Sequence, residues 1–134
     1  MTYRHSITVR YGECDMQGVV FNAHYLAYAD DAVAQWFTAV LPADAMFVAG
    51  NGDATFDFMV KKATVTWAGG STFGDVLDLD CSVGRWGTTS FDVVVRGSVG
   101  GDERVEIVLV YVSVTPGMHT PCRVPESLKA ALDA

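Results

Sequence analysis

Apolar and polar residues alternate at the start of the chain, where Ile7, Val9 and Tyr11 are separated by Thr8 and Arg10. A period of two residues is typical of a β-strand that buries one face. The chain is therefore predicted to open with a half-buried strand.

The period lengthens from about residue 22. Apolar side chains then recur every three or four positions, and no Gly or Pro interrupts the segment before Pro42. Asn22 suits the N-cap of the helix that this pattern predicts, and Asp30 and Asp31 lie on the polar side. The apolar stripe consists of Leu26, Ala29, Val33, Trp36 or Phe37, and Val40. One long helix with one apolar stripe needs a broad partner, such as a sheet.

Further strand-like runs follow a loop around residues 49–54. Alternating runs begin at Phe56, Leu77 and Phe91, and a longer run covers residues 104–115. The apolar phase slips within the first run, which a β-bulge near Lys61 and Lys62 explains. The last run is apolar on both faces, as expected of a strand that is central in a sheet or covered by another subunit. With a short helix at residues 126–132, the order indicates an α+β domain of two layers.

Composition and charge narrow the class of protein. The 134 residues are half apolar, which predicts one globular domain over residues 1–134. The net charge of −7 lacks the basic excess that nucleic-acid binding requires, so no nucleic-acid partner is expected. No apolar run approaches the ~18 residues of a membrane span, and the N-terminus has no apolar signal core. We therefore expect a cytoplasmic protein without a membrane span.

The three cysteines are odd in number and widely spaced. Cys14, Cys81 and Cys122 form no C-x-x-C pattern, so neither a disulfide framework nor a structural zinc site is indicated. They are interpreted as reduced thiols.

Polar groups gather where the first strand gives way to the helix, in the segment RYGECDMQGVVFNAHYLAYADD of residues 10–31. Asp15 precedes Gly18, and the helix begins about seven residues after Asp15. A helix N-terminus has unpaired N–H groups and the positive end of the dipole, both of which stabilise an anion. A carboxylate beside such an oxyanion site suits acyl-transfer hydrolysis.

The same segment resembles a known family. Residues 11–26, YGECDMQGVVFNAHYL, are similar to the pattern D-x-x-G-h-V-x-x-x-x-Y-h of the hotdog-fold acyl-CoA thioesterases of the 4-hydroxybenzoyl-CoA thioesterase type, which include the thioesterases of the Tol-Pal system. The order of elements and the helix rooted at Pro125 also resemble the family, so the likeness covers essentially the whole chain.

The resemblance implies a hotdog fold, in which a curved antiparallel sheet of about five strands wraps a long central helix. It also implies homodimers, often paired into a homotetramer, with active sites at the dimer interface. By resemblance, Asp15 acts as the nucleophile or as a general base on water, and the backbone N–H at Asn22 polarises the thioester carbonyl. Family members commonly have His or Tyr at the Asn22 position, a change that a main-chain donor tolerates.

Other residues are candidates for substrate binding. Gly18 allows a tight turn or close approach to the ligand, while His24 and Tyr25 in the first helical turn lie near the expected site. Lys61 and Lys62 stand out as adjacent charges among the candidates for docking the phosphates of coenzyme A, which also include Arg85, Arg96, Arg104 and Arg123. Each has an ordinary alternative: a turn glycine, a surface histidine, a core tyrosine, and edge lysines that prevent aggregation.

These features predict an acyl-CoA thioesterase that uses no metal or redox cofactor and takes a coenzyme A thioester as substrate. Two alternatives stay open. A dehydratase or hydratase on the same fold would need a histidine and an acid across the substrate, with His24 as one half. A non-catalytic acyl-CoA binding subunit would use Asp15 only structurally.

Overall fold

The computed structural model describes residues 1–43, 45 and 56–133. Along the chain the elements are β1 (Tyr3–Thr8), a 3-10 helix η1 (Tyr11–Glu13), α1 (His24–Val40), β2 (Phe58–Trp67), β3 (Val76–Trp86), β4 (Ser90–Val99), β5 (Asp102–Ser113) and α2 (Glu126–Asp133). This is the order that the periodicity predicted. The loop expected around residues 49–54 lies outside the described residues.

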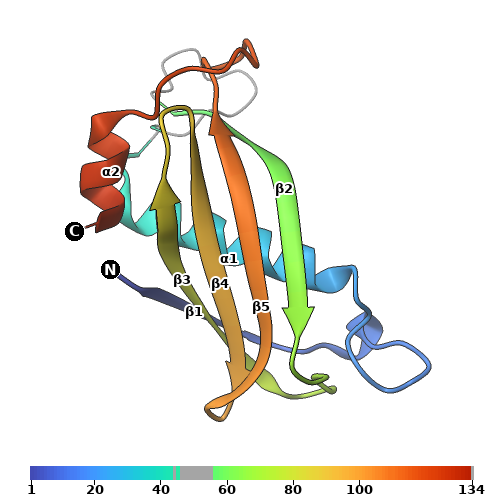
Figure 1. Cartoon of the computed structure of the whole chain (residues 1–134). Helices are drawn as coiled ribbons and strands as arrows, with labels where there is room; N and C mark the ends of the chain where they lie inside the picture. The colour runs from blue at the N-terminus through green and yellow to red at the C-terminus, as the bar shows by residue number, and fades with distance from the viewer. Residues whose placement is uncertain (44, 46–55, 134) are drawn as a thin grey trace.

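The five strands form one antiparallel sheet in the order β1-β3-β4-β5-β2. Helix α1 runs across one face of this sheet (Figure 1). Strand β5 lies between β4 and β2, so it has one of the two positions that its sequence predicted, and the apolar residues of its second face are partly buried. The predicted α+β architecture, with a long helix against a five-stranded antiparallel sheet, is confirmed.

The hydrophobic core fills the layer between α1 and the sheet. Alternate side chains of β3, β4 and β5 are buried there: Leu77, Leu79, Cys81, Phe91, Val93, Val95, Val105, Ile107 and Leu109. The helix contributes Trp36, which is fully buried, together with Ala29, Val33 and Phe37. Burial raises the pKa of the Cys81 thiol to about 12, so this cysteine behaves as a small apolar side chain.

Two details of the predicted elements are wrong. Leu26 was expected in the apolar stripe but is 42% exposed, and Tyr25 and Tyr28 occupy the buried positions instead. A stripe that starts at Leu26 and one that starts at Tyr25 both have a spacing of three or four residues, so periodicity alone did not show which of them is buried. Tyr11 was expected to continue the first strand, but it begins η1 and is 81% exposed, with its ring edge-on to Phe73.

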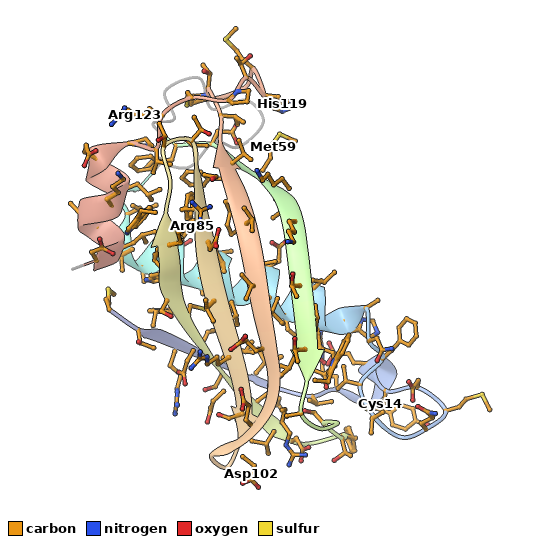
Figure 2. The ribbon with its side chains drawn as sticks, viewed as in Figure 1. Cys14, Met59, Arg85, Asp102, His119 and Arg123 are labelled. Atoms are coloured by element: carbon orange, nitrogen blue, oxygen red, sulfur yellow. The ribbon has the colours of Figure 1, made fainter. Side chains whose placement is uncertain are left out.

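Strand β2 is an edge of the sheet and carries the predicted bulge. Its pairing with β5 shifts register between Val60 and Lys62, so Lys61 is the extra residue. Every side chain of β2 except Phe58 and Val65 is exposed, including Met59, which Figure 2 labels near the start of the strand. Among the described residues, no strand pairs with the outer edge of β2.

Helix α2 closes the other end of the core. Leu128 and Leu132 are buried, and the helix contacts α1 and β3. The indole N–H of Trp86, at the end of β3, donates to the Asp133 carboxylate at 3.1 Å. Within the described ranges, no helix is long and apolar enough to cross a membrane.

Candidate active site

Asp15 lies in a tight turn between η1 and α1. The N–H of Gly18 donates to the Asp15 carbonyl at 3.0 Å, and the N–H of Asp15 donates to the Val19 carbonyl at 2.9 Å. One carboxylate oxygen of Asp15 accepts the N–H of Gln17 at 2.8 Å. Gly18 has φ +80°, a conformation that glycine adopts readily. The turn thus orients a partly exposed carboxylate and leaves its second oxygen outside this hydrogen bond.

The loop that carries Asp15 is attached to two other parts of the chain. The N–H of Phe21 donates to the Glu13 carbonyl, and the N–H of Val20 donates to the Ser71 carbonyl, each at 2.9 Å. Val19 also forms an isolated bridge with Thr72, beyond the end of β2. Figure 2 labels Cys14 in this loop, between β1 and the start of α1. The position of Asp15 therefore depends on a segment far away in the sequence.

Glu13 lies at the start of the loop that carries Asp15 and is fixed by Arg10. Its carboxylate accepts hydrogen bonds from the backbone N–H and from Nη2 of Arg10, both at 2.8 Å. These bonds lower the pKa of the Glu13 carboxyl to about 2. Burial, followed by the nearby Glu13 charge, raises the pKa of Tyr28 on α1. Glu13 is therefore a fixed negative charge between η1 and α1.

The start of α1 differs from the prediction in one respect. The N-cap is Ala23 and no side chain caps the helix, so the expected role of Asn22 as N-cap is wrong. The Asn22 carbonyl instead accepts the N–H of Tyr25 at 3.3 Å, because the chain already turns at Phe21 and Asn22. Within the described part of the chain, the N–H groups of Asn22 and Ala23 donate to no protein acceptor. These are free main-chain donors at the positive end of a long helix.

A cavity of about 310 Å³ is lined by Asn22, the first of these two residues, and Ala23 follows it without being part of the lining. Its lining combines the end of the Asp15 loop, the start of α1 and the end of β2: Val19, Val20, Asn22, Tyr25, Trp67, Ala68, Gly69 and Gly70. None of these side chains is charged, and the rings of Tyr25 and Trp67 meet edge to face at 5.9 Å. The arrangement provides an uncharged compartment with both polar and aromatic surface beside main-chain hydrogen-bond donors.

The structure brings some of the predicted site residues together and separates others. Asn22 and Tyr25 line the cavity, and Gly18 and Asp15 lie in the adjoining turn, although Asp15 is not a lining residue. His24 lines a different cavity, of about 430 Å³, together with residues of β1 and η1. In that cavity Nε2 of His5 lies 3.0 Å from the Asp31 carboxylate.

Lys61 and Lys62 are exposed at the bulge of β2 and do not line the cavity, so their role in phosphate docking stays a prediction. Residues 67–70 were not anticipated as part of the site, because they lie far in the sequence from the segment of residues 10–31 that predicted it. Two adjacent glycines after a strand were the available signal. Among the described residues, no group of three or more His, Cys, Asp or Glu side chains is arranged to hold a metal ion.

Comparison with known proteins adds the family context. The model of the thioesterase-like superfamily matches residues 9–132. No curated protein matches the sequence significantly. Among solved structures, a 1,4-dihydroxy-2-naphthoyl-CoA thioesterase from Synechocystis is similar with a TM-score of 0.84 at 16% identity, covering 99% of this chain and 96% of that chain.

Two further structures are similar over most of the chain. A thioesterase-superfamily protein from Jannaschia sp. CCS1 has a TM-score of 0.85 at 18% identity, covering 98% of this chain and 91% of that one. A gentisyl-coenzyme A thioesterase has a TM-score of 0.81 at 19% identity, covering 98% of this chain and all of that one. At such identities the likeness establishes the fold, which is the hotdog fold.

Proposed function

The chain belongs to the thioesterase-like superfamily, and from this premise we propose that it hydrolyses an acyl-CoA thioester to a free carboxylic acid and CoA. The observation that carries the proposal is the Asp15 turn next to an uncharged cavity at the free N-terminus of α1. A carboxylate and preorganised N–H donors are the two groups that thioester hydrolysis requires.

In the proposed reaction the acyl group occupies the cavity and its carbonyl oxygen faces the N–H groups of Asn22 and Ala23. These donors and the helix dipole stabilise the negative charge that develops on that oxygen. Asp15 either attacks the carbonyl carbon, giving a mixed anhydride that water hydrolyses, or removes a proton from the attacking water. In both routes the C–S bond breaks and the thiolate of CoA leaves. In the general-base route Asp15 returns its proton to the thiolate; in the nucleophilic route the water that cleaves the anhydride supplies the proton that the thiolate takes up, and Asp15 is regenerated as a carboxylate.

The cavity favours an apolar acyl group. Tyr25 is almost fully buried, and Trp67 forms the facing aromatic wall. An aromatic acyl group would stack on or pack edge-on to the ring of Trp67, which is 45% exposed. Two of the similar structures are named for aromatic acyl-CoA substrates, so aromatic esters belong in the first panel of substrates.

We expect two copies of the chain to pair through β2. The strand has ten residues, its outer edge is open, and Met59, Val60 and Trp67 expose 45–46% of their surface. An edge of this kind is a template for another strand. In an antiparallel pair around a two-fold axis, the Phe58 end of one β2 meets the Trp67 end of the other, which would complete the cavity wall and bring Lys61 and Lys62 toward the ligand's phosphates.

The decisive experiment measures thiol release from short aliphatic, long aliphatic and aromatic acyl-CoAs. We expect Asp15→Asn to lower kcat by roughly 10²–10⁴-fold, the usual contribution of a positioned acid or base. Asp102→Asn is the matched control, because Asp102 is exposed at the start of β5, at the tip of the β4–β5 hairpin (Figure 2). An Asp15→Asn variant that is folded and fully active would contradict the assignment of Asp15.

A non-catalytic binding subunit remains the second candidate, because Asp15 adjoins the cavity without lining it. That candidate predicts saturable binding of an acyl-CoA, seen by calorimetry, with no release of thiol. The dehydratase alternative would have to use the other cavity, because the described residues that line this one include neither a histidine nor an acid, whereas His24 lines the cavity that also contains Glu13 and Asp31.

A further inference from the structure

We propose that Arg104 is a positioning residue, which holds the wall formed by residues 68–70 against the loop of Asp15. Its effect on catalysis rests on the proposed thioesterase function, whereas its effect on the wall does not. In the sequence Arg104 is one of several scattered cations, distant from both the Asp15 motif and the end of β2.

A β-bulge places Arg104 where it can act on the wall. On β4 and β5, Val105 pairs with Gly97 and Glu103 pairs with Ser98, so Arg104 is an extra residue without a partner on β4. Bulges interrupt a strand ladder and change the direction of side chains. The residue beside Arg104, Val105, pairs on its other side with Trp67 at the end of β2. Arg104 therefore lies next to the point where β2 leaves the sheet.

Arg104 contacts three successive residues of the cavity wall. Its carbonyl oxygen accepts the N–H of Ala68 at 2.8 Å and the N–H of Gly69 at 3.2 Å. Its Nη1 donates to the carbonyl oxygen of Gly70 at 2.7 Å. Both the main chain and the side chain of one residue thus hold the turn after β2, and all three wall residues line the cavity.

The wall in turn contacts the Asp15 loop. A Cβ atom on Gly70 would lie 2.9 Å from Cγ1 of Val19, so the Gly70 backbone packs against the Val19 side chain at a distance that only a glycine allows. The carbonyl of Ser71 accepts the N–H of Val20, and the carbonyl of Val19 accepts the N–H of Asp15. A continuous set of contacts therefore leads from the guanidinium of Arg104 to the backbone of Asp15.

Arg104 differs from the arginines on β3 and β4 in its lack of an acidic partner among the described residues. Arg85 and Arg96 pair with Asp92 and Glu106 at 3.1 and 3.2 Å. In the part of the chain that is described, no carboxylate lies within 4.0 Å of a nitrogen of Arg104. Its Nε is buried and has no hydrogen-bond partner among these residues. A cation without an acidic partner gains no stabilisation from an ion pair, but it donates a strong charge-assisted hydrogen bond to a carbonyl oxygen.

The test compares Arg104→Met, which keeps much of the side-chain length but removes the donors, with Arg96→Met as the matched control. We expect the amide of Val20 to exchange its hydrogen about tenfold faster in Arg104→Met, because the side-chain bond to the Gly70 carbonyl is lost while the main-chain bonds to Ala68 and Gly69 remain. We also expect kcat for thiol release to fall roughly 10–100-fold with KM little changed, since a small displacement of a catalytic group is costly. Arg104→Lys keeps the charge and one donor, and should restore part of both losses.

Each result decides one part of the proposal. Wild-type exchange at Val20 in folded Arg104→Met would overturn the positioning role whatever the activity. Faster exchange with unchanged kcat, or with only KM raised, would contradict the proposed effect of Arg104 on catalysis. A wild-type protein that cleaves no thioester would refute the proposed function, while the exchange measurement would still decide the wall contact. If Arg104→Met does not fold, the same measurements on Arg104→Lys against Arg96→Lys decide.

Discussion

The backbone N–H of Asp15 donates a 2.9 Å hydrogen bond to the carbonyl oxygen of Val19, four residues later. This bond closes the turn that carries the candidate catalytic carboxylate. Because Val19 also bridges to Thr72, the turn is tied to the segment that follows β2. The direction of the Asp15 side chain is thus set by backbone contacts, and substitutions that alter the turn should affect activity.

Gly18→Ala tests the turn itself. Gly18 has φ +80°, and a Cβ there would meet no atom within 4 Å, so the whole cost is backbone strain. We expect a loss of about 1–2 kcal/mol in the free energy of unfolding, measured by urea denaturation, with a fall in kcat. Gly12→Ala is the control, because its Cβ also meets nothing and its φ is not positive. Equal stability of the two variants would contradict this account.

Gly70→Ala tests the contact between the wall and the loop. The added methyl group would lie 2.9 Å from Cγ1 of Val19, which forces a shift costing about 1–3 kcal/mol. Gly69→Ala should cost less, since its nearest neighbours are Arg104 side-chain atoms at 3.7 and 3.8 Å. Both the midpoint temperature of thermal unfolding and the rate of thiol release should be lower for Gly70→Ala than for Gly69→Ala. The opposite ranking would show that the wall and the loop do not depend on each other.

Glu13→Gln tests the support beneath the loop through its dependence on pH. The pKa of the Glu13 carboxyl is lowered from 4.5 to about 2, so the ionised group stabilises the folded state above pH 4.5. This contribution is lost as the pH falls from 4.5 toward 2. We expect the free energy of unfolding at pH 7 to be about 1 kcal/mol higher for the wild type than for Glu13→Gln. The difference is modest because Arg10 is largely exposed to solvent.

Urea denaturation of both proteins between pH 7 and pH 3 measures this difference. The gap between wild type and Glu13→Gln should narrow below pH 4.5. A gap that stays constant with pH would mean that the amide loses packing or hydrogen bonding, and that the carboxylate charge contributes nothing.

Val60→Glu tests the proposed pairing of two copies through β2. Val60 is 46% exposed, and a charge there would repel its symmetry mate and the partner's edge. We expect sedimentation to show a dimer or larger assembly for the wild type and a monomer for Val60→Glu. Val76→Glu is the matched control, because Val76 is 49% exposed at the start of β3. A monomeric wild type would refute the pairing.

The candidate site was only partly predictable from the sequence. Asp15, Asn22 and Tyr25 lie within one short segment, so a local motif was enough to single them out. His24 is adjacent in sequence to this group, yet it lines the cavity next to β1, because neighbouring positions on a helix point in directions about 100° apart. The wall at residues 67–70 and its contact with Arg104 depend on strand pairing between distant segments, which no local pattern reveals.

The sequence by itself determined which segments become strands and helices, because apolar periods of two and of about 3.6 residues require one buried face. It also predicted the bulge at Lys61, because a one-residue shift in the alternation of apolar and polar positions is what a bulge produces in a strand. Only the tertiary structure decided the phase of α1 and the end of the first strand. It alone also decided the site's second wall, because register and the packing of β2 against β5 bring Trp67, Gly70 and Arg104 together across long stretches of chain.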